Sequence, residues 1–355
     1  MLNTLGFGII GCGVIFRHHA DAIKSIEGAR LAAVADIITE KAAKMAEEYG
    51  CDYYTDYNEL LKRQDIQIVC ICTPSGTHSE IGIASARAGK HVITEKPIDI
   101  TLDSTDRLIS SCREAGVKLS CIFQWRYTED IAKLKKAVEA GKLGQLNFGA
   151  SHTKWYRSQE YYDSVDWRGT WKLDGGGALM NQSIHYVDIL QYIMGPVDEV
   201  FAYCATRSHV RIEVEDVAVA VVKFKNGAVG IIEGNTAAFP GFCTRLDVYG
   251  SNGSVIIEDN KVKEWKLKND GLKVGFYGEL SKEPVLEDDI DSGKENGASS
   301  AAIAMNSHID QIRDFCNAIR NGTEVPVPGG EARHSLAIIL AIYESSRNGK
   351  PVKVK

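Results

Sequence analysis

The sequence predicts an α/β protein in two parts, a doubly wound parallel sheet followed by an α+β domain with a large, open, mainly antiparallel sheet. Three observations predict this. Strand-like apolar runs alternate with helical patterns through the first 122 residues. Several of these runs are apolar without interruption, as expected for a parallel sheet covered on both faces. After about Phe123, strand-like runs follow one another directly, which favours antiparallel pairing.

The first part has a regular order of strands and helices. Its expected strands are residues 5–10, 30–36, 67–74, 90–97 and 117–123. The helical patterns between them cover residues 14–26, 39–50, 77–89 and 101–116. Gly50 is expected to end the second helix as its C-cap. We therefore place the first domain at residues 1–123.

The second part, at residues 124–355, is expected to hold fewer helices and more hairpins. The expected elements are a helix at 130–140, a strand at 143–155, hairpins at 214–234 and 243–259, and closing helices near 305–320 and 330–348. Asn226-Gly227 predicts a type I′ turn in the first hairpin. The polar residues 268–300 are expected to form a long exposed loop.

Composition narrows the function classes. A length of 355 residues suits two domains, and a net charge of −6 argues against nucleic acid or an anionic membrane as the main partner. The chain has no apolar run of the ~20 residues that a membrane span needs, and no leader pattern precedes the first strand. We expect a cytoplasmic protein. The nine cysteines include no C-x-x-C pair and are interpreted as small buried hydrophobes.

A glycine-rich turn follows the first strand. Gly11 would permit the tight turn, and Gly13 would let the backbone approach a pyrophosphate. Val14 and Ile15 then lead into a helix whose N–H groups would face the anion, while Phe16 replaces the third glycine of the usual fingerprint. Gly-rich turns are common after strands, so this motif predicts cofactor binding only together with its context.

An acidic residue at the end of the second strand supplies that context. Asp36 lies near the ~20-residue offset at which a carboxylate accepts hydrogen bonds from an adenosine ribose. Because a carboxylate repels a 2′-phosphate and no arginine follows it, the sequence favours NAD over NADP. The alternative is that Asp36 only caps the next helix.

A lysine ends the fourth apolar strand, in the segment Glu95-Lys96-Pro97. Ligands bind at the carboxyl ends of strands in open α/β sheets. Partial burial would lower the pKa of Lys96 toward the range of an acid/base group. The alternative is an exposed lysine that extends into solvent.

Residues 175–188, GGGALMNQSIHYVD, place polar side chains at helical spacing after three glycines. Asn181, His185 and Asp188 are expected to share one face. A metal site would use His185 and Asp188, but third and fourth ligands are not evident, and we predict no metal. The other readings are a proton-transfer site or a structural histidine.

An aromatic segment at residues 152–174 precedes these glycines. Its aromatic side chains, Trp155 among them, suit the C–H face of a sugar ring, and Arg157 and Arg168 suit an anionic group. The alternative is a packed loop at a domain or subunit interface.

The motifs GIIGCG, Asp36, TPSGTHSE, AGKHVITEKP and GGGALMNQSIH occur in this order over essentially the whole chain. The sequence therefore resembles the Gfo/Idh/MocA family of oxidoreductases, with an N-terminal Rossmann domain. The resemblance implies an NAD(P)-dependent dehydrogenase that acts on a CH–OH group of a sugar, sugar acid, cyclitol or related polyol. It also implies a homodimer or homotetramer formed through the second sheet.

The same resemblance implies residue roles. Lys96 would lie beside the nicotinamide and contact the reacting hydroxyl, Glu95 would lie near the nicotinamide ribose, and Pro97 would follow a cis peptide. The remaining residues implied to line the cofactor are Thr73, Pro74, His78 and Gln124.

Substrate binding is implied for Asn181 and for Arg126, which follows Gln124 and Trp125. Many members have Asp where this chain has Asn181, and an amide cannot take up a proton. Acid/base work would therefore fall on His185 and Lys96. Two alternatives stay open: an enzyme with tightly bound, internally recycled NAD, and a non-catalytic regulator that senses NAD or sugar.

Overall fold

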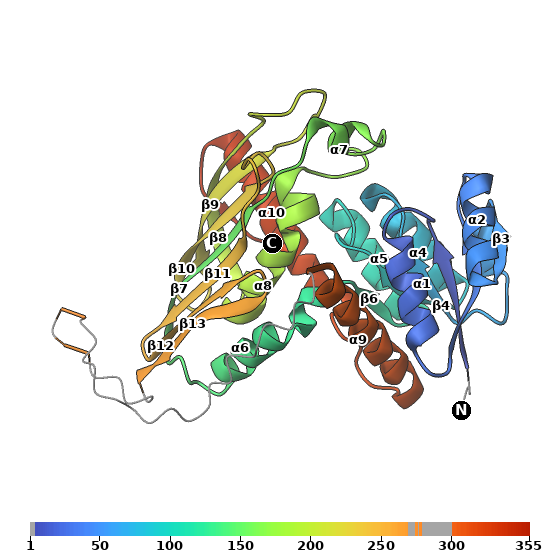
Figure 1. Cartoon of the computed structure of the whole chain (residues 1–355), viewed down its shortest axis with the longest axis horizontal. Helices are drawn as coiled ribbons and strands as arrows, with labels where there is room; N and C mark the ends of the chain where they lie inside the picture. The colour runs from blue at the N-terminus through green and yellow to red at the C-terminus, as the bar shows by residue number, and fades with distance from the viewer. Residues whose placement is uncertain (1–3, 269–273, 276, 279–299) are drawn as a thin grey trace.

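The computed structural model describes residues 4–268, 274–275, 277–278 and 300–355. It shows two bodies side by side, each built on one sheet (Figure 1). The polar segment at 268–300, predicted to be a loop, lies almost wholly outside the described residues.

The first sheet is parallel throughout and has the order β3-β2-β1-β4-β5-β6. Its strands are β1 (Leu5–Ile10), β2 (Ala29–Ala35), β3 (Asp52–Tyr54), β4 (Ile68–Ile71), β5 (His91–Thr94) and β6 (Leu119–Cys121). All residues of β1 and β4 are buried, which agrees with their continuous apolar runs. The doubly wound prediction is confirmed.

Helices cover this sheet at the predicted places. They are α1 (Phe16–Ser25), α2 (Thr39–Tyr49), α3 (Tyr57–Leu61), α4 (His78–Arg87) and α5 (Leu102–Glu114), with a 3₁₀ turn at Ser75–Thr77. Gly50 caps α2 with φ 67°, as predicted. β3 and α3 were not predicted. β3 has only three residues, none of them buried, and carries no apolar run, and α3 has only five residues.

The second sheet has, within the described residues, the order β13-β12-β11-β7-β10-β9-β8-β14. Its strands are β7 (Leu146–Lys154), β8 (Val197–Ala205), β9 (Val217–Phe224), β10 (Val229–Asn235), β11 (Thr244–Gly250), β12 (Gly253–Glu258), β13 (Lys261–Leu267) and β14 (Val352–Lys353). Only the β7–β10 pair is parallel among these neighbours. The mainly antiparallel prediction is confirmed.

The helical segments of this half are the 3₁₀ turn Gln124–Tyr127, α6 (Glu129–Glu139), α7 (Gln159–Asp163), the π-helix Ala178–Ser183, α8 (Ile184–Met194), α9 (Ser300–Asn321) and α10 (Gly329–Asn348). Helices α6, α8 and α10 lie on the side of the second sheet that faces the first domain (Figure 1). None of the described helices is long and apolar enough to cross a membrane.

The β9–β10 hairpin is confirmed, but its predicted type I′ turn is wrong. A type I′ turn needs positive φ at both central residues. Only Gly227 of the Asn226-Gly227 pair has positive φ, at 91°. Phe224 accepts a bond from Gly227 N at 3.0 Å and donates to Ala228 O at 2.9 Å. The loop is therefore a type I turn over Lys225 and Asn226, closed by a glycine bulge.

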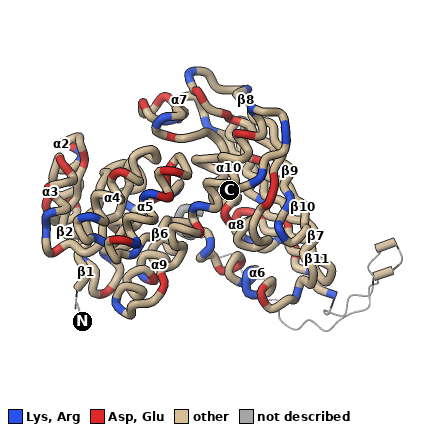
Figure 2. The backbone as a smooth tube through the Cα atoms, turned by 180° about the vertical axis from the view of Figure 1, so that it is seen from behind, with Lys and Arg blue, Asp and Glu red and all other residues tan. Residues whose placement is uncertain are grey.

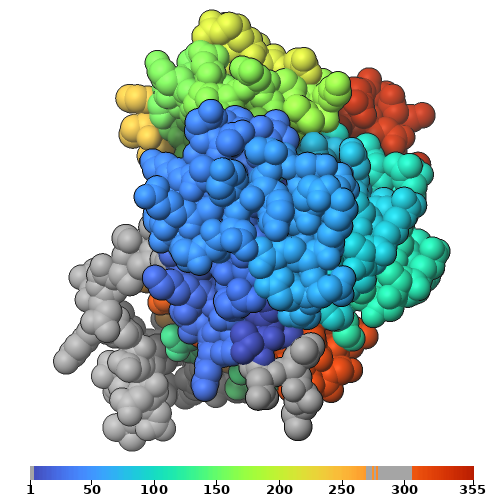
Figure 3. All heavy atoms as spheres, turned by 90° about the vertical axis from the view of Figure 1, so that its right-hand side faces the viewer, coloured from blue at the N-terminus to red at the C-terminus, as the bar shows by residue number. Residues whose placement is uncertain are grey.

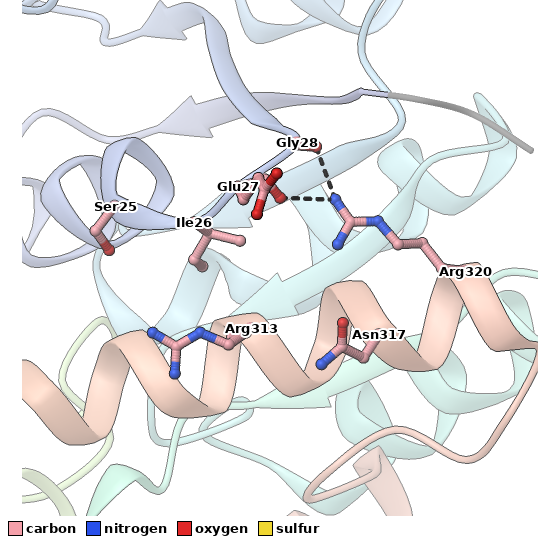
Figure 4. Close-up of a pocket in the computed structure, with 7 residues that line it drawn as sticks. All are labelled: Ser25, Ile26, Glu27, Gly28, Arg313, Asn317 and Arg320. Carbon is pink, nitrogen blue, oxygen red and sulfur yellow. Dashed lines mark hydrogen bonds between the residues drawn. The ribbon is translucent and has the colours of Figure 1, made fainter.

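Helix α9 returns to the first domain, although residues 124–355 were assigned to the second. Its residues Ile312, Phe315 and Cys316 belong to the same apolar cluster as strand β1 and helix α1. Arg320 donates to the carbonyls of Glu27 and Gly28 at 3.0 and 2.8 Å, across a surface groove (Figure 4). The first body is thus completed by a helix that begins about 180 residues after the end of β6.

The surface carries both signs of charge. Lys and Arg alternate with Asp and Glu along the chain in the view from behind (Figure 2). Viewed from the side of the first domain, residues of the first quarter of the chain form most of the face (Figure 3). Figure 2 shows no continuous basic stripe along the described part of the chain.

Candidate active site

The glycine-rich turn joins β1 to α1 and leaves room for a ligand. Gly11 has φ 98°, and a Cβ there would come within 2.5 Å of the Cys72 carbonyl oxygen, so no other residue fits. A Cβ at Gly13 would meet nothing within 4 Å. Val14 is 84% exposed, and no side chain caps the N-terminus of α1. The turn therefore offers backbone N–H groups to an anion, which fits a pyrophosphate.

Phe16 takes the place of the third glycine of the dinucleotide-binding fingerprint. Its ring is fully buried and meets Tyr49 edge-on, with 5.4 Å between ring centroids. The aromatic ring packs α1 against α2, whereas the usual glycine allows close packing of helix on strand.

Asp36 folds back onto the same turn. One carboxylate oxygen accepts a bond from Cys12 N at 2.8 Å, and the other accepts from Ile38 N at 2.9 Å. Helix α2 begins at Thr39 after Ile38, without a side-chain cap. Asp36 is therefore not simply the cap of that helix, and it lies beside the turn where a dinucleotide's ribose would be expected.

The loop after β4 is tied to the loop after β5. His78 is buried, and its ring nitrogens lie 2.8 Å from the Pro97 carbonyl oxygen and 2.9 Å from that of Thr73. Pro74 precedes the 3₁₀ turn Ser75–Thr77, which lies between Thr73 and His78 in the chain. His78 therefore holds the two loops together, and its 1% exposed side chain is not available to line a cofactor as predicted.

Glu95 is a buried carboxylate between two imidazoles. His19 Nε2 lies 2.8 Å and His308 Nε2 3.7 Å from Glu95 Oε1. Burial raises the pKa of Glu95, but the two histidines outweigh it and hold that pKa well below its usual range. Ligand atoms of these three residues lie within 4.8 Å of one another, which is the spacing of a possible cation site. At 2.8 Å the His19–Glu95 contact is a hydrogen bond, and it accounts for the buried charge without an ion.

Lys96 turns toward the second domain. The Lys96–Pro97 peptide is cis, as the resemblance implied. Lys96 Nζ donates to the backbone oxygen of Asn181 at 2.8 Å. Burial lowers the pKa of Lys96, while the charges of Glu95 and Asp174 act in the opposite direction.

The three glycines let the backbone pass under two bulky groups. A Cβ at Gly176 would lie 2.1 Å from the Tyr343 hydroxyl, and one at Gly177 would lie 1.8 Å from the Glu215 carbonyl oxygen. The Glu215 carboxylate accepts from Gly177 N, Leu179 N and the Tyr343 hydroxyl at 2.8–3.0 Å. Burial raises the pKa of Glu215 to about 7. This carboxylate anchors the start of the π-helix that carries Asn181.

The three polar side chains predicted to share one face have different partners in the structure. Asn181 Nδ2 donates to Asp174, and Asp188 accepts from Arg126 and from Ser335 Oγ. His185 makes neither of these bonds. The Asp188 carboxylate is thus engaged by Arg126 and Ser335.

His185 has a buried nitrogen without a partner. Its Nδ1 finds no hydrogen bond among the described residues. The ring stacks on Trp125 with centroids 4.7 Å apart and meets Phe123 edge-on. Burial, reinforced by the charge of Lys96, lowers the pKa of His185 well below its usual range. His185 is thus a buried imidazole that is held in place by packing on Trp125 and Phe123.

Arg126 was expected to bind substrate, but its side chain is engaged in ion pairs. Its Nε and Nη2 bind the Asp188 carboxylate at 2.6 and 2.7 Å, and its Nη1 binds Glu331 at 2.5 Å. The side chain is 6% exposed. Arg126 therefore joins α8 to α10 and is not placed to bind substrate. Gln124 is buried beside it, and its Oε1 has no partner among the described residues.

Trp125 and the aromatic segment 152–174 form a wall of packed side chains, which begins where Trp125 stacks on the His185 ring. Trp125 contacts Trp155 edge-on at 6.1 Å, and Arg157 lies over the Trp155 ring at 5.0 Å. Arg157 and Arg168 also lie over the Tyr161 ring, at 5.3 and 4.2 Å.

This wall is tied to the π-helix. Gln182 Nε2 donates to the Tyr161 hydroxyl at 2.8 Å, one residue from Asn181. Within the described part of the chain, neither Arg157 nor Arg168 pairs with a carboxylate, and Arg168 Nε is buried without a partner. Arg157 Nη1 donates to Tyr156 O at 3.3 Å and Arg168 Nη1 donates to Tyr161 O at 3.1 Å, so both guanidinium groups bond to neutral oxygens and keep an unpaired charge within the described residues.

Five residues of this region were not predicted from the sequence: Asp174, Glu215, Tyr343, His19 and His308. The signal for Asp174 was its position directly before the glycines. Glu215 and Tyr343 carry no local signal, since they reach the glycines from 38 and 166 residues away by residue number.

Comparison with known proteins agrees with this geometry. Residues 5–123 match the model of an oxidoreductase family with an NAD-binding Rossmann fold, and residues 131–256 match the GFO/IDH/MocA C-terminal domain. The chain is thus an oxidoreductase-type protein with an NAD-binding Rossmann domain.

Whole-chain relatives define it further. It is 30% identical over 359 residues to the myo-inositol 2-dehydrogenase of Thermotoga maritima, covering 98% of each chain. It is 27% identical over 300 residues to the levoglucosan dehydrogenase of Pseudarthrobacter phenanthrenivorans, covering 75% of this chain and 76% of that one. The WlbA dehydrogenase of Bordetella pertussis, solved with NADH and UDP-GlcNAcA, matches with TM-score 0.85, 31% identity and 99% coverage of both chains. The chain belongs to the Gfo/Idh/MocA family.

Proposed function

We propose that this protein is an NAD-dependent dehydrogenase that oxidises a CH–OH group of a sugar, sugar acid or cyclitol. The observation that carries the proposal is the meeting of Lys96 and Asn181, across the two domains and beside a buried, unpartnered His185. The relatives named as sugar and inositol dehydrogenases support the same reaction class.

The side chains divide the work by their chemistry. When bound, the nicotinamide supplies the carbon that accepts a hydride. Lys96 donates a hydrogen bond to the substrate hydroxyl oxygen, and the neutral His185 takes up the hydroxyl proton as the carbonyl forms. Asn181 orients the substrate. Trp125 and Trp155 exclude water from one side of the site.

The cofactor preference follows from Asp36. Its carboxylate lies beside the phosphate turn, and Ile37, which follows it, is 89% exposed and offers no positive charge. A 2′-phosphate there would meet a like charge without compensation. We infer that NAD is preferred over NADP.

The substrate class follows from Arg157 and Arg168. Both arginines stack on Tyr161 without a carboxylate partner in the described residues, so a substrate anion would give them one. We infer that sugar acids, or sugars with a phosphate group, are preferred over neutral cyclitols. The WlbA relative was solved with an acidic nucleotide sugar, whereas myo-inositol is neutral.

We also infer that the open face of the second sheet pairs two copies of this chain. Phe201, Val221 and Ile231 are cross-strand neighbours on the less buried face of β8, β9 and β10. Val221 is 54% exposed. An apolar row of this kind suits a self-complementary contact.

The test is a steady-state screen with purified protein. Formation of NADH from NAD, or of NADPH from NADP, is followed against glucose, myo-inositol, glucuronate, glucose 6-phosphate and UDP-N-acetylglucosaminuronic acid. We expect turnover with NAD, strongest for an acidic sugar, and a rise in KM of at least about tenfold in Arg168→Met for that sugar, the equivalent of about 1.4 kcal/mol.

Different failures have different meanings. Equal turnover of neutral and acidic sugars would remove the anion site but leave the dehydrogenase. NAD that stays bound through purification without net NADH formation would replace the proposal with internal cofactor recycling. Absence of NAD binding and of turnover would reject the function itself.

A further inference from the structure

Asp174 occupies a fixed position directly before the three glycines. Its side chain is buried, and Oδ2 accepts from Gly169 N at 2.9 Å. The backbone N–H groups of Asp174 and Gly175 both donate to Thr170 O. The turn from Gly169 to Gly175 is therefore wrapped around this carboxylate, which has little freedom to move.

The second oxygen of this carboxylate determines the orientation of the Asn181 amide. Asn181 Nδ2 lies 2.7 Å from Asp174 Oδ1. An ionised carboxylate only accepts hydrogen bonds, so the nitrogen of the amide must face Asp174 and its oxygen must face away. No donor among the described residues contacts Asn181 Oδ1, and the residue is only half-buried. The amide thus presents a free acceptor beside Lys96.

Asp174 also faces the charges of the site. Lys96 and Arg168 are the cations that act on its carboxylate, and Glu95 is the other anion that acts on Lys96. Burial raises the pKa of Asp174, while the bonds from Gly169 N and Asn181 lower it. The bonds from Asn181 to Asp174 and from Lys96 to Asn181 O form one continuous chain.

We propose that Asp174 is a positioning residue for the dehydrogenase reaction: its carboxylate turns the Asn181 amide so that Oδ1 accepts the hydrogen bond of a substrate hydroxyl. The proposal rests on the proposed function. In this chain the negative charge is on Asp174, which is hydrogen-bonded to Asn181, and Asn181 is the side chain that meets the substrate. The substrate hydroxyl is therefore held by a neutral amide oxygen, and its proton goes to His185.

Three variants test this. In Asp174→Asn, one of the two donors that face the carboxylate, Gly169 N or Asn181 Nδ2, loses its acceptor, and the Asn181 amide is free to turn. We expect kcat to fall about 10- to 100-fold, the usual effect of removing the partner that orients a ligand-contacting side chain. NADH binding, followed by its fluorescence, should stay unchanged. Asp259→Asn is the matched control, since Asp259 accepts backbone Thr244 N and touches no residue of the site.

Asn181→Asp gives a readout that a merely structural role would not move. The introduced carboxyl would lie at hydrogen-bond distance from Asp174, so the two groups cannot both ionise and their shared proton is held to higher pH. While protonated, the introduced group still donates to Asp174 and still presents an acceptor. We expect activity at acidic pH that is lost as pH rises through the raised pKa of the pair. The pH profile of the wild type should lack this limb, that is, the loss of activity with rising pH.

The exchange variant Asp174→Asn/Asn181→Asp completes the test. It restores one carboxylate and one amide across the same contact, so we expect the added limb to disappear and kcat to recover to within about tenfold of wild type. Wild-type kcat in Asp174→Asn, or a wild-type pH profile in Asn181→Asp, would overturn the proposal. If Asp174→Asn does not fold, the other two variants decide. A wild type without turnover would reject the proposed function instead.

Discussion

At the scale of single residues, the site depends on buried polar groups that lack some of their usual hydrogen-bond partners within the described residues. His185 has a buried nitrogen without a partner, and Lys96 has one bond, to a backbone oxygen, where three are possible. A buried polar atom without a partner costs free energy that a ligand recovers when it binds. Arg126 and Asp188, which the sequence analysis considered for substrate and metal binding, are instead paired with each other and with Glu331 and Ser335.

The depressed pKa of His185 predicts the pH dependence of catalysis. A base must be neutral, and burial together with Lys96 keeps the folded-state pKa of His185 below that of an ordinary histidine. Activity should therefore be present above this lowered pKa and be lost as pH falls through it. We expect the acidic limb of the kcat/KM profile to lie below the pKa of free histidine.

Replacing this side chain tests the assignment. His185→Gln should lower kcat about 10²- to 10⁴-fold and abolish the acidic limb, because a general base is removed. His334→Gln, on the exposed face of α10, is the control and should keep wild-type kinetics. Retention of the acidic limb in His185→Gln would assign that limb to another group.

At the scale of elements, the run from Gly175 to α8 is the most constrained part of the chain. Glycines are needed because a carbonyl of Glu215 and the hydroxyl of Tyr343 press against the backbone. The first turn after them is a π-helix, a form that is often found at functional sites. The N–H groups at its N-terminus donate to the Glu215 carboxylate, and a negative charge at this end interacts favourably with the helix dipole.

Adding one methyl group should break this arrangement. Gly177→Ala would place a Cβ 1.8 Å from the Glu215 carbonyl oxygen, so backbone must shift. We expect a loss of about 1–3 kcal/mol or more in the free energy of unfolding, measured by denaturant titration, with loss of turnover. Gly330→Ala, at the start of α10, meets nothing within 4 Å and should be neutral or slightly stabilising. Equal stability of the two variants would contradict the tight packing.

At the scale of the whole molecule, two bodies are held together by segments that cross between them. Helix α9 completes the first body, and α10 packs on α8 and β8 of the second and on α5 of the first. The site lies where the carboxyl ends of β4 and β5 meet the π-helix, so it exists only while both bodies keep their relative position. The open sheet face is free of these contacts.

That open face gives a prediction about assembly. Val221→Asp would place a charge in the apolar row with Phe201 and Ile231. In a two-fold contact the charge faces itself, and we expect the association to weaken by about 2–5 kcal/mol. Light scattering after size exclusion should show a fall in mass. Tyr53→Asp, on the exposed edge of the first sheet, is the control. A monomeric wild type would reject this interface.

Much of the first body could be predicted because its signals are local. Continuous apolar runs, the Gly11 turn and the Gly50 cap each depend on a few neighbouring residues. The strand β3 was missed because it has no such run, and the turn at Asn226 was misassigned because two residues fit either turn type. Domain membership of α9 was missed because amphipathic spacing does not say which partner a helix covers.

By itself, the sequence determined the fold class, the phosphate turn, the placement of Lys96 at a strand end and of His185 on the helix after the glycines. Only the tertiary structure decided that Arg126 pairs with Asp188, that Asn181 bonds to Asp174, and that Glu215 anchors the π-helix. The physical reason is the range of the interactions. Secondary structure follows from periodicity and capping over a few residues, whereas the pairing of buried charges depends on packing between segments far apart in the chain.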